Sequence, residues 1–404
     1  MRRIFLAGII LLTSVNPIVA QPAPLEAYWD DGLKFRSKDD KFKFSAGGRV
    51  HLDAAFSGQS GALDSLVGKA SDNVQIRRAR LSFEGTINNM LAYEAEFDFG
   101  KTVDFADVYL AFIKLPFFDR LMVGYFREPF GMEQVTSSNT VVFMERSLPT
   151  AFGRPRNTGV MVRKKLLNNK LTAYAGFFRI TNDVGIDEEA EGKHSFSSRW
   201  AFVPLLDTIH NKVLHIGAGL NIHSPQQQKH SVEAQNESDL SPTYISTGDL
   251  SNTRRVHQIS GEFGYTKNRL AIMSEYVHSF ANFDKDTLPV SRRTPRFNSF
   301  YTTVSYFLTG GKRGYNSNRN SFSSINISKD NVEANWRGAW EIALRFSYIN
   351  IADVGKEMNT MSNTTLGINW YFNSNTRLMM NYIFTMLSSG YKANVLQFRM
   401  QFTF

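Results

Sequence analysis

Four arginines gather in one stretch of the chain whose residue types could bind anions. Residues 128–155 separate two alternating segments, and Arg127, Arg146, Arg154 and Arg156 lie within this stretch or at its ends. A guanidinium group stays charged at physiological pH and presents paired N–H donors that match the oxygens of phosphate or carboxylate. The spacing therefore predicts a loop that offers positive charge to passing solutes.

The same stretch is unusually apolar for a loop. Its large apolar residues are Phe130, Met132, Val141, Val142, Phe143, Met144, Leu148 and Phe152. These side chains would gain nothing in water, whereas a loop packed on the inner wall of a barrel would bury them. We expect this third external loop to fold inward and to narrow the lumen. In the sharpest form of the prediction, Arg146, Arg154 and Arg156 project into the narrowest part.

The elements that must position this loop are strands. Residues 394–404 alternate apolar and mainly polar side chains, which is the pattern of a β-strand with two different faces. Reading the whole chain in this way predicts sixteen strands, near residues 42–56, 74–87, 91–99, 104–115, 120–127, 157–167, 170–180, 196–206, 211–224, 254–266, 268–281, 297–309, 336–351, 361–373, 376–388 and 393–404. An even number of such strands is typical of an all-β transmembrane antiparallel β-barrel around an aqueous lumen, with both termini periplasmic.

Connection lengths fit this barrel. Short links rich in Asn, such as 88–89 and 168–169, alternate with long ones, as periplasmic turns alternate with external loops. One link breaks the pattern, because residues 310–335 fall on the short-turn side. This segment contains either a further hairpin or a stretch folded into the lumen. The His-Ser and Asn/Ser-rich stretches 223–253 and 314–328 are predicted to be exposed loops.

The first twenty residues have the features of an export signal. Arg2 and Arg3 precede an apolar run at 4–12, and small residues end at Ala20. A transmembrane anchor would need about 20 apolar residues, and this run is too short. We therefore predict three segments: a cleaved signal peptide at 1–20, a periplasmic lead-in at 21–41 and the barrel at 42–404. The chain has no cysteine, and a barrel closed by hydrogen bonds needs no disulfide.

The formal net charge is +9, and +7 without Arg2 and Arg3. Nucleic acid or anionic lipid could be the partner of a basic chain, but inward arginines in an exported barrel favour anionic solutes. The predicted lumen-lining arginines are Arg49, Arg78, Arg80, Arg337, Arg345, Arg377 and Arg399. Further anion-binding candidates in the long link are Lys312, Arg313, Arg319 and Lys329. The alternative for the wall arginines is structural pairing with inward carboxylates such as Glu84, Glu94, Glu96, Asp98 and Glu341.

Several motifs together resemble the phosphate-selective porin O/P family. They are Gly124–Gly131, Thr136–Ser138, Phe143–Arg146, Arg156–Gly159, Arg77–Arg80 with Phe83–Gly85, Tyr93–Phe99, Gly338–Glu341 with Arg345–Tyr348, and Gly367–Tyr371. The resemblance covers essentially the whole mature chain. It implies a trimeric sixteen-stranded porin with an in-folded third loop, arginines along the lumen, lysines at a central anion site, and a periplasmic segment folded into the lumen. The third loop here carries no lysine, so an arginine of that loop would have to take its place.

No catalytic constellation and no metal-ligand spacing emerges, because the eight histidines are scattered and no HExxH motif is present. We expect no enzyme activity, no metal and no cofactor. The predicted function is passive diffusion of anions, with phosphate or polyphosphate implied by the resemblance, across the outer membrane of a Gram-negative bacterium. The expected partners are outer-membrane lipid, small anions and two further copies of the chain, and no nucleic acid. The alternatives are a general, weakly selective porin and a plugged barrel acting as a surface binding or structural protein.

Overall fold

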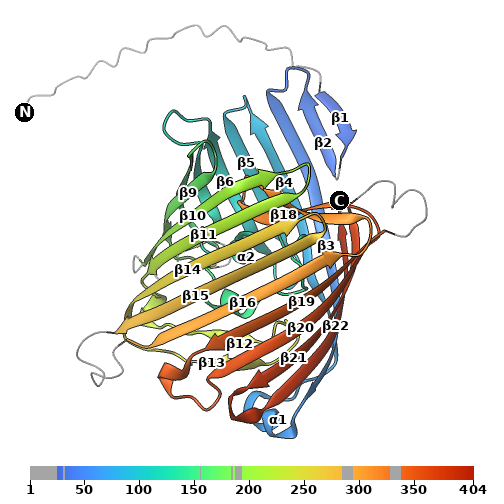
Figure 1. Cartoon of the computed structure of the whole chain (residues 1–404). Helices are drawn as coiled ribbons and strands as arrows, with labels where there is room; N and C mark the ends of the chain where they lie inside the picture. The colour runs from blue at the N-terminus through green and yellow to red at the C-terminus, as the bar shows by residue number, and fades with distance from the viewer. Residues whose placement is uncertain are drawn as a thin grey trace, which may run out of the picture.

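The computed structural model describes residues 25–30, 32–154, 156–182, 185–186, 193–283, 294–327 and 338–404. Within these residues one antiparallel sheet closes on itself, because the last strand pairs with β3 from Ala393↔Gln59 to Thr403↔Arg49 (Figure 1). The predicted signal peptide at 1–20, Lys329 and Arg337 lie outside the described residues. No described helix is long and apolar enough to cross a membrane.

Sixteen described strands form the wall. They are β3 (Phe42–Gln59), β4 (Asn73–Ile87), β5 (Leu91–Asp98), β6 (Asp104–Ile113), β7 (Arg120–Arg127), β8 (Arg156–Leu166), β9 (Leu171–Arg179), β10 (His194–Asp207), β11 (Lys212–His223), β14 (Thr253–Lys267), β15 (Leu270–Phe283), β16 (Arg296–Phe307), β19 (Ala339–Asn350), β20 (Thr360–Tyr371), β21 (Thr376–Leu387) and β22 (Lys392–Thr403). Each matches one of the predicted strands within a few residues. The predicted barrel is confirmed.

The alternation of the strands separates the two faces of the wall. In β22, Val395 and Arg399 are buried toward the lumen, whereas Met400 and Phe402 are exposed on the outer face. Apolar side chains such as Leu366 and Ile259 continue the exposed outer belt on other strands. This arrangement suits a barrel whose outside meets hydrocarbon and whose inside is polar.

The tight turns also follow the prediction. Asn88, Asn89, Asn168, Asn169 and Asn268 all have positive φ between 52° and 66°. Asparagine tolerates this left-handed conformation better than most residues with a side chain. These turns lie at the same end of the barrel as the C-terminus (Figure 1).

The lead-in carries a hairpin that the sequence reading missed. Strands β1 (Leu25–Trp29) and β2 (Leu33–Ser37) pair with each other, and β2 pairs with the first residues of β3, from Leu33↔Ala46 to Arg36↔Lys43. The hairpin extends the sheet beyond the closed wall at the end where the C-terminus lies (Figure 1).

Three connections enter the barrel. Loop 3 (128–155) carries α2 (Met132–Val135) and the 3-10 turn η1 (Leu148–Phe152). Loop 5 (224–252) carries η2 (Gln226–Gln228) and the hairpin of β12 (Glu233–Gln235) and β13 (Thr243–Ser246). The third connection forms the hairpin of β17 (Gly311–Asn316) and β18 (Ser321–Ile327). The remaining short elements are α1 (Gly61–Val67), η4 (Ala352–Val354) and η5 (Ser388–Gly390).

The prediction of exposed loops at 223–253 and 314–328 is wrong for much of both stretches. In loop 5, Val232, Tyr244 and Ile245 are buried in the same apolar cluster as Phe130 of loop 3. In the β17–β18 hairpin, Phe322 is buried against Phe143 of loop 3. The polar composition of these two stretches did not indicate that they are buried, because only their few apolar residues pack against the barrel interior.

Candidate anion pathway

Loop 3 lies inside the lumen and is packed as predicted. Its eight large apolar side chains are only 1 to 6 % exposed. Phe152 stacks on Phe297 of the wall with a ring separation of 6.5 Å, and the Arg345 guanidinium lies over the Phe143 ring at 4.3 Å. The apolar residues thus hold the loop against the wall.

Three wall arginines fasten loop 3 through its carbonyl groups. Arg377 donates to the carbonyl oxygens of Val141 and Val142 at 2.8 and 3.0 Å. Arg399 donates to the carbonyl oxygen of Met144, and Arg345 donates to that of Glu145 at 3.1 Å. These predicted lumen arginines therefore position the loop.

Two of these three wall arginines also have carboxylate partners. Arg399 forms a bidentate ion pair with Asp53, with both distances 2.7 Å, and Arg345 bonds to Glu237 of loop 5, with its Nε at 3.1 Å. The structural-pairing alternative thus describes both. Glu237 also accepts a hydrogen bond from Thr365 at 3.0 Å, so loop 5 is tied to the wall as well.

A buried carboxylate holds the start of loop 3. Glu128 is fully buried and accepts hydrogen bonds from Asn157, Ser195, Ser197 and Asn221. Arg154 completes the group, with its Nη2 3.6 Å from the carboxylate and its Nη1 3.3 Å from the His223 ring. Arg154 is therefore a partner of the loop's anchor and lines neither of the cavities described below.

The β17–β18 hairpin is held in the lumen by contacts with the wall and with loop 3. Arg313 forms a buried ion pair with Glu341 of β19 at 2.9 Å and donates to the carbonyl oxygen of Thr140 in loop 3. Arg199 and Arg163 donate to backbone oxygens of the hairpin turn at 2.7 and 3.0 Å. The hairpin and loop 3 therefore meet within the lumen.

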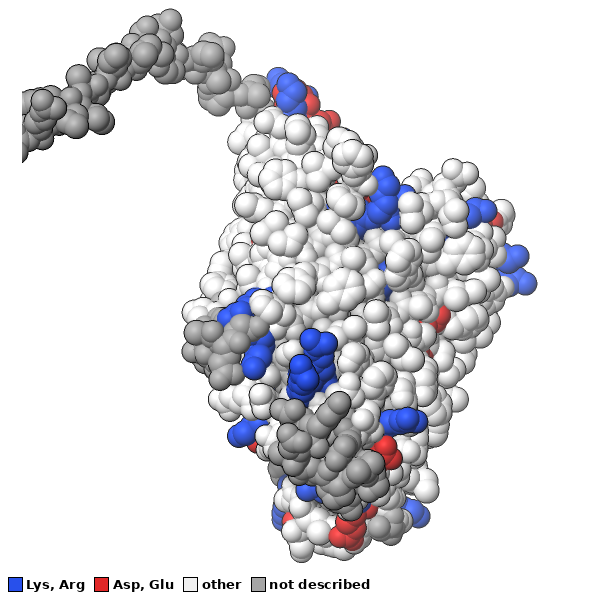
Figure 2. All heavy atoms as spheres, turned by 90° about the vertical axis from the view of Figure 1, so that its left-hand side faces the viewer, with Lys and Arg blue, Asp and Glu red and all other residues white. Residues whose placement is uncertain are grey.

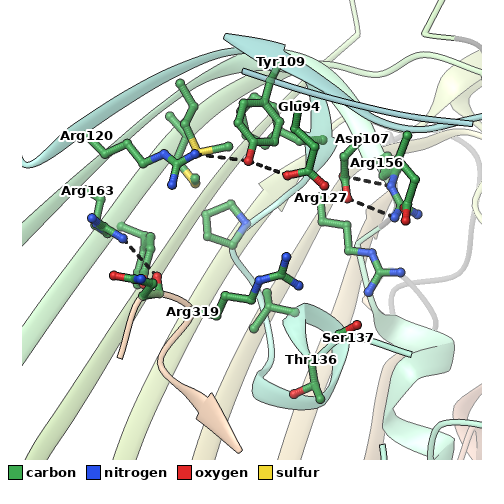
Figure 3. Close-up of a pocket in the computed structure, with 18 of the residues that line it drawn as sticks. Glu94, Asp107, Tyr109, Arg120, Arg127, Thr136, Ser137, Arg156, Arg163 and Arg319 are labelled. Atoms are coloured by element: carbon green, nitrogen blue, oxygen red, sulfur yellow. Dashed lines mark hydrogen bonds and ion pairs between the residues drawn. The ribbon is translucent and has the colours of Figure 1, made fainter. Parts of the chain in front are cut away.

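A cavity of about 180 Å³ lies between loop 3, the hairpin turn and strands β3 to β10. The charged residues among its described lining are Arg49, Arg80, Arg120, Arg127, Arg156, Arg163, Arg199, Arg319, Glu94, Glu96 and Asp107. Eight arginines thus face three carboxylates. Figure 3 shows Arg127 and Arg319 reaching into the space between the wall and the turn that carries Thr136 and Ser137.

Ion pairs neutralise part of the positive charge of these arginines. Arg156 forms two hydrogen bonds with Asp107, at 3.0 and 3.3 Å, and Glu96 pairs with both Arg80 and Arg49. These three arginines are consequently screened by neighbouring carboxylates.

Four cations in the cavity, Arg120, Arg127, Arg163 and Arg319, have no carboxylate partner among the described residues, whereas Arg199 is paired with Glu262 at 2.8 Å. Arg127 donates to the carbonyl oxygen of Gln134, and the exposed side chain of Arg319 makes no recorded bond. Both were sequence candidates. The structure brings them together at the centre of the cavity (Figure 3).

A second cavity, of about 280 Å³, lies on the external side, between loop 3 and the β12 region of loop 5. Arg77, Arg78 and Arg146 line it. At this point β4 has a bulge, because His51 pairs with Arg78 and Leu52 with Ile76, so two consecutive arginines face the lumen. Arg77 pairs with Glu145 at 3.0 Å and with Asp239 at 3.3 Å.

The guanidinium groups of Arg78 and Arg146 differ in their hydrogen-bond partners. Arg78 is 6 % exposed, and its Nε and Nη1 have no hydrogen-bond partner in the described residues. Arg146 donates to the carbonyl oxygens of Glu133 and Thr136 at 3.0 and 2.8 Å. Burial lowers the pKa of Arg146 to about 10, which leaves it charged at neutral pH.

The loop arginines therefore do not meet in one place. Arg156 lies at the central cavity and Arg146 at the external one, whereas Arg154 is buried beside Glu128. Lys312 lies in a separate space of about 450 Å³ beside Arg269 and His210 at the periplasmic end.

Sequence reasoning missed Arg120, Arg163 and Arg199, which also line the central cavity. The signal was present, because each falls on a predicted strand, and Arg199 occupies an inward position between outward Ser198 and Trp200 neighbours. Arg163 and Arg120 share a register position on β7 and β8.

Comparison with known proteins agrees with this architecture. The sequence profile described as phosphate-selective porin O and P matches residues 44–404. The chain is 22 % identical over 393 residues to Porin O of Pseudomonas aeruginosa, covering 87 % of this chain and 85 % of that protein. It is 25 % identical over 423 residues to an uncharacterised protein of Caulobacter vibrioides, covering 97 % and 80 %.

Solved structures share the fold at low identity. An anion-selective porin from Comamonas acidovorans superposes with a TM-score of 0.59 at 11 % identity, over 90 % of this chain and all of that chain. The trimer form of OmpT, an outer membrane protein of Vibrio cholerae, gives a TM-score of 0.56 at 11 % identity, with the same coverage. With a barrel of sixteen strands and a profile match over nearly its whole length, the chain is an outer-membrane protein of Gram-negative type and belongs to the phosphate-selective porin O and P family.

Proposed function

We propose that the chain is a passive outer-membrane channel that favours anions. The observation that carries this proposal is the central cavity, where eight arginines face three carboxylates in the described lining. Opposite charges about 4 Å apart attract by roughly 1–4 kcal/mol at dielectrics between those of water and a protein surface. A solute with negative charge is therefore stabilised there, and a cation is repelled.

Arginines line the successive cavities, although in the external one Arg77, Arg78 and Arg146 are accompanied by four carboxylates, those of Glu145, Glu233, Glu237 and Asp239. An anion entering from outside meets Arg78 in the external cavity and then Arg127 and Arg319 in the central one. Arg49 lines both the central cavity and a further space of about 300 Å³ on the periplasmic side. Conduction needs binding weak enough for release, and several spread sites satisfy this better than one deep site.

Phosphate or polyphosphate is the proposed solute. The central cavity offers guanidinium groups beside hydroxyl groups, since Ser137 and Ser138 line it together with Arg127. Ser138 accepts a hydrogen bond from Arg49 at 3.2 Å, which leaves its own O–H free to donate to a phosphate oxygen. The description of the family supports the same solute, and the trimer form of OmpT supports a homotrimer.

The experiment is a planar-bilayer measurement on the refolded chain from residue 21 onward. In a gradient of potassium chloride, the sign of the reversal potential should show chloride preference, and added phosphate should reduce the chloride current as it occupies the arginines. Sulfate at the same charge concentration is the matched control for phosphate specificity. A cation-preferring channel would contradict the proposal, and equal block by both anions would leave anion preference without phosphate specificity.

Two other functions are distinguished by the same traces. A general porin would conduct with a reversal potential near zero. The three in-folded segments favour the plugged barrel as the second candidate, because loop 3, loop 5 and the β17–β18 hairpin all occupy the lumen. A plugged barrel would insert into the bilayer without discrete current steps.

A further inference from the structure

The outer surface of the barrel carries a group of arginines that the lumen does not use. Arg254, Arg255 and Arg296 are exposed at the external ends of β14 and β16. Arg255 alternates with buried Val256 and therefore points outward. A bulge makes Arg254 an extra residue between the pairs Thr253↔Phe283 and Arg255↔Asn282, and Arg254 is exposed as well.

Strand register brings Arg296 onto the same surface. His257 pairs with Phe280, and Phe280 pairs with Arg296, so these three residues form one row across β14, β15 and β16. Neighbouring strands are about 4.8 Å apart, which separates β14 and β16 by roughly 10 Å. Long arginine side chains at this spacing reach the same headgroup.

A layer of aromatic and histidine rings lies next to the arginines on the outer face. The His257 ring stacks on Phe280 at 5.1 Å with an angle of 4°, and His278 stacks on Tyr276 at 6.5 Å. Farther along β14 the outward residues are the exposed Ile259 and Phe263. The order from cation to ring to aliphatic side chain is that of a membrane interface, where aromatic rings lie at headgroup level.

The three arginines have no acidic partner of their own among the described residues. No ion pair joins them to a described carboxylate, and the nearby Asp353 accepts the backbone N–H of Arg296 at 2.8 Å. Figure 2, which faces this side of the barrel, shows a wide uncharged belt with lysine and arginine near both ends. Within the described residues the group therefore carries three positive charges beside the single carboxylate of Asp353.

We propose that Arg254, Arg255 and Arg296 bind the phosphorylated headgroup of a lipid in the external leaflet. Arginine presents a planar fork that matches phosphate oxygens, and the rings beside it pack against the upper acyl region. The inference rests on the outer-membrane placement but not on the selectivity of the lumen. It gives the barrel a bound lipid on the side formed by β14 to β16.

The test uses the full mature chain in detergent, titrated with diphosphoryl lipid A and, separately, with the same lipid after removal of its phosphates. The variant is Arg254→Ala with Arg255→Ala and Arg296→Ala. The matched control is Lys170→Ala with Lys212→Ala and Lys267→Ala, which removes three exposed cations at the periplasmic end. Retention of lipid is measured by native mass spectrometry, and bilayer conductance confirms that each barrel is folded.

We expect the wild-type chain and the lysine control to retain the phosphorylated lipid, and the arginine variant to bind it at least about tenfold more weakly. Dephosphorylated lipid should bind all three chains equally weakly. Equal retention by the arginine variant, or an equal loss in the lysine control, would overturn the inference. Complete displacement of the lipid by inorganic phosphate would also overturn it, because the site would then recognise a free anion. An anion-selective current in every chain would leave the proposed function standing in each case.

Discussion

Arg313 of the in-folded hairpin and Glu341 of wall strand β19 form a buried ion pair, with Nη2 2.9 Å from Oε1. The same guanidinium donates to the carbonyl oxygen of Thr140 in loop 3. One side chain thus joins the wall, the hairpin that enters from the periplasmic end and the loop that enters from outside. The width of the lumen therefore depends on contacts between two segments that are far apart in the chain.

Removal of this connection should widen the channel. We expect Arg313→Ala to leave the Glu341 carboxylate buried without its partner, at a cost of about 3–5 kcal/mol to the docked state of the hairpin. Single-channel conductance should rise and anion preference should fall. Lys170→Ala serves as the control, since it lies in an exposed turn of the same end. Unchanged conductance in a folded Arg313→Ala channel would show that the hairpin does not limit the path.

The central cavity makes a second prediction about selectivity. Arg127→Ala combined with Arg319→Ala should lower chloride preference in asymmetric salt and weaken the block by phosphate, since each guanidinium contributes about 1 kcal/mol or more. Arg49→Ala should have a smaller effect, because Glu96 already offsets that charge. Equal reversal potentials in the wild-type channel, the Arg127→Ala/Arg319→Ala variant and the Arg49→Ala variant would exclude Arg127 and Arg319 as the residues that select anions.

Substitution of Arg156 should alter ion selectivity, whereas substitution of Arg154 should alter stability. Arg156→Ala frees the carboxylate of Asp107 at the central cavity and should therefore shift the reversal potential toward cations. Arg154→Ala should mainly reduce stability, because it removes the cation beside buried Glu128. Thermal unfolding and reversal potential, measured on the same preparations, separate the two effects. A selectivity change in Arg154→Ala at unchanged stability would contradict this division.

A matched pair of wall arginines tests the difference between paired and unpaired charge. Arg78→Met removes a buried guanidinium with two unsatisfied donors, and we expect it to stabilise the barrel while it lowers anion preference. Arg399→Met leaves Asp53 buried without its bidentate partner and should destabilise by about 3–5 kcal/mol. Urea unfolding in lipid vesicles ranks the two. Destabilisation of similar size in both variants would mean that the donors of Arg78 have hydrogen-bond partners in the membrane-embedded protein.

Loop 5 should loosen in acid. Burial and the nearby Arg154 lower the pKa of His230 to about 4, from an ordinary value of 6.5. The opened loop therefore binds a proton more readily than the folded loop. The stabilisation is fully present above about pH 6.5 and is lost as the pH falls toward 4, by at most about 3 kcal/mol. Hydrogen exchange of residues 224–252 at pH 7 and pH 4.5 measures the change, and His230→Gln should remove it.

The strands were predictable because a barrel wall imposes a two-residue period on every segment that spans it. The faces of Arg399 and Met400, for example, can be assigned from residue type alone, because the polar one is buried toward the lumen and the apolar one is exposed on the outer face. The burial of loop 3 was predictable for a related reason, since large apolar side chains such as Phe143 and Phe152 are unfavourable in a solvent-exposed loop. In both cases the signal is burial of apolar area, which depends on residue type rather than on the partner.

The pairing of the charges could not be predicted in this way. Arg78 and Arg399 are both inward arginines, yet among the described residues only Arg399 forms an ion pair with a carboxylate, and residue type does not mark this difference. Loop 5 was missed because Glu237, which anchors it to Arg345, appears in the sequence as one more polar residue of a polar loop. Partners across the lumen depend on three-dimensional position.

The pairing of β22 with β3 joins residues about as far apart along the chain as this fold allows. The amide of Phe404 donates to the carbonyl oxygen of Gly48 at 3.0 Å, and the amide of Gly48 donates in return at 2.7 Å. Closing so long a loop is slow, because its entropy is lost before the contact forms. The two outermost strands therefore stay as open edges until the last step of assembly. Protection of these edges during transit to the membrane should govern the yield of folded channel more than the strength of any contact inside it.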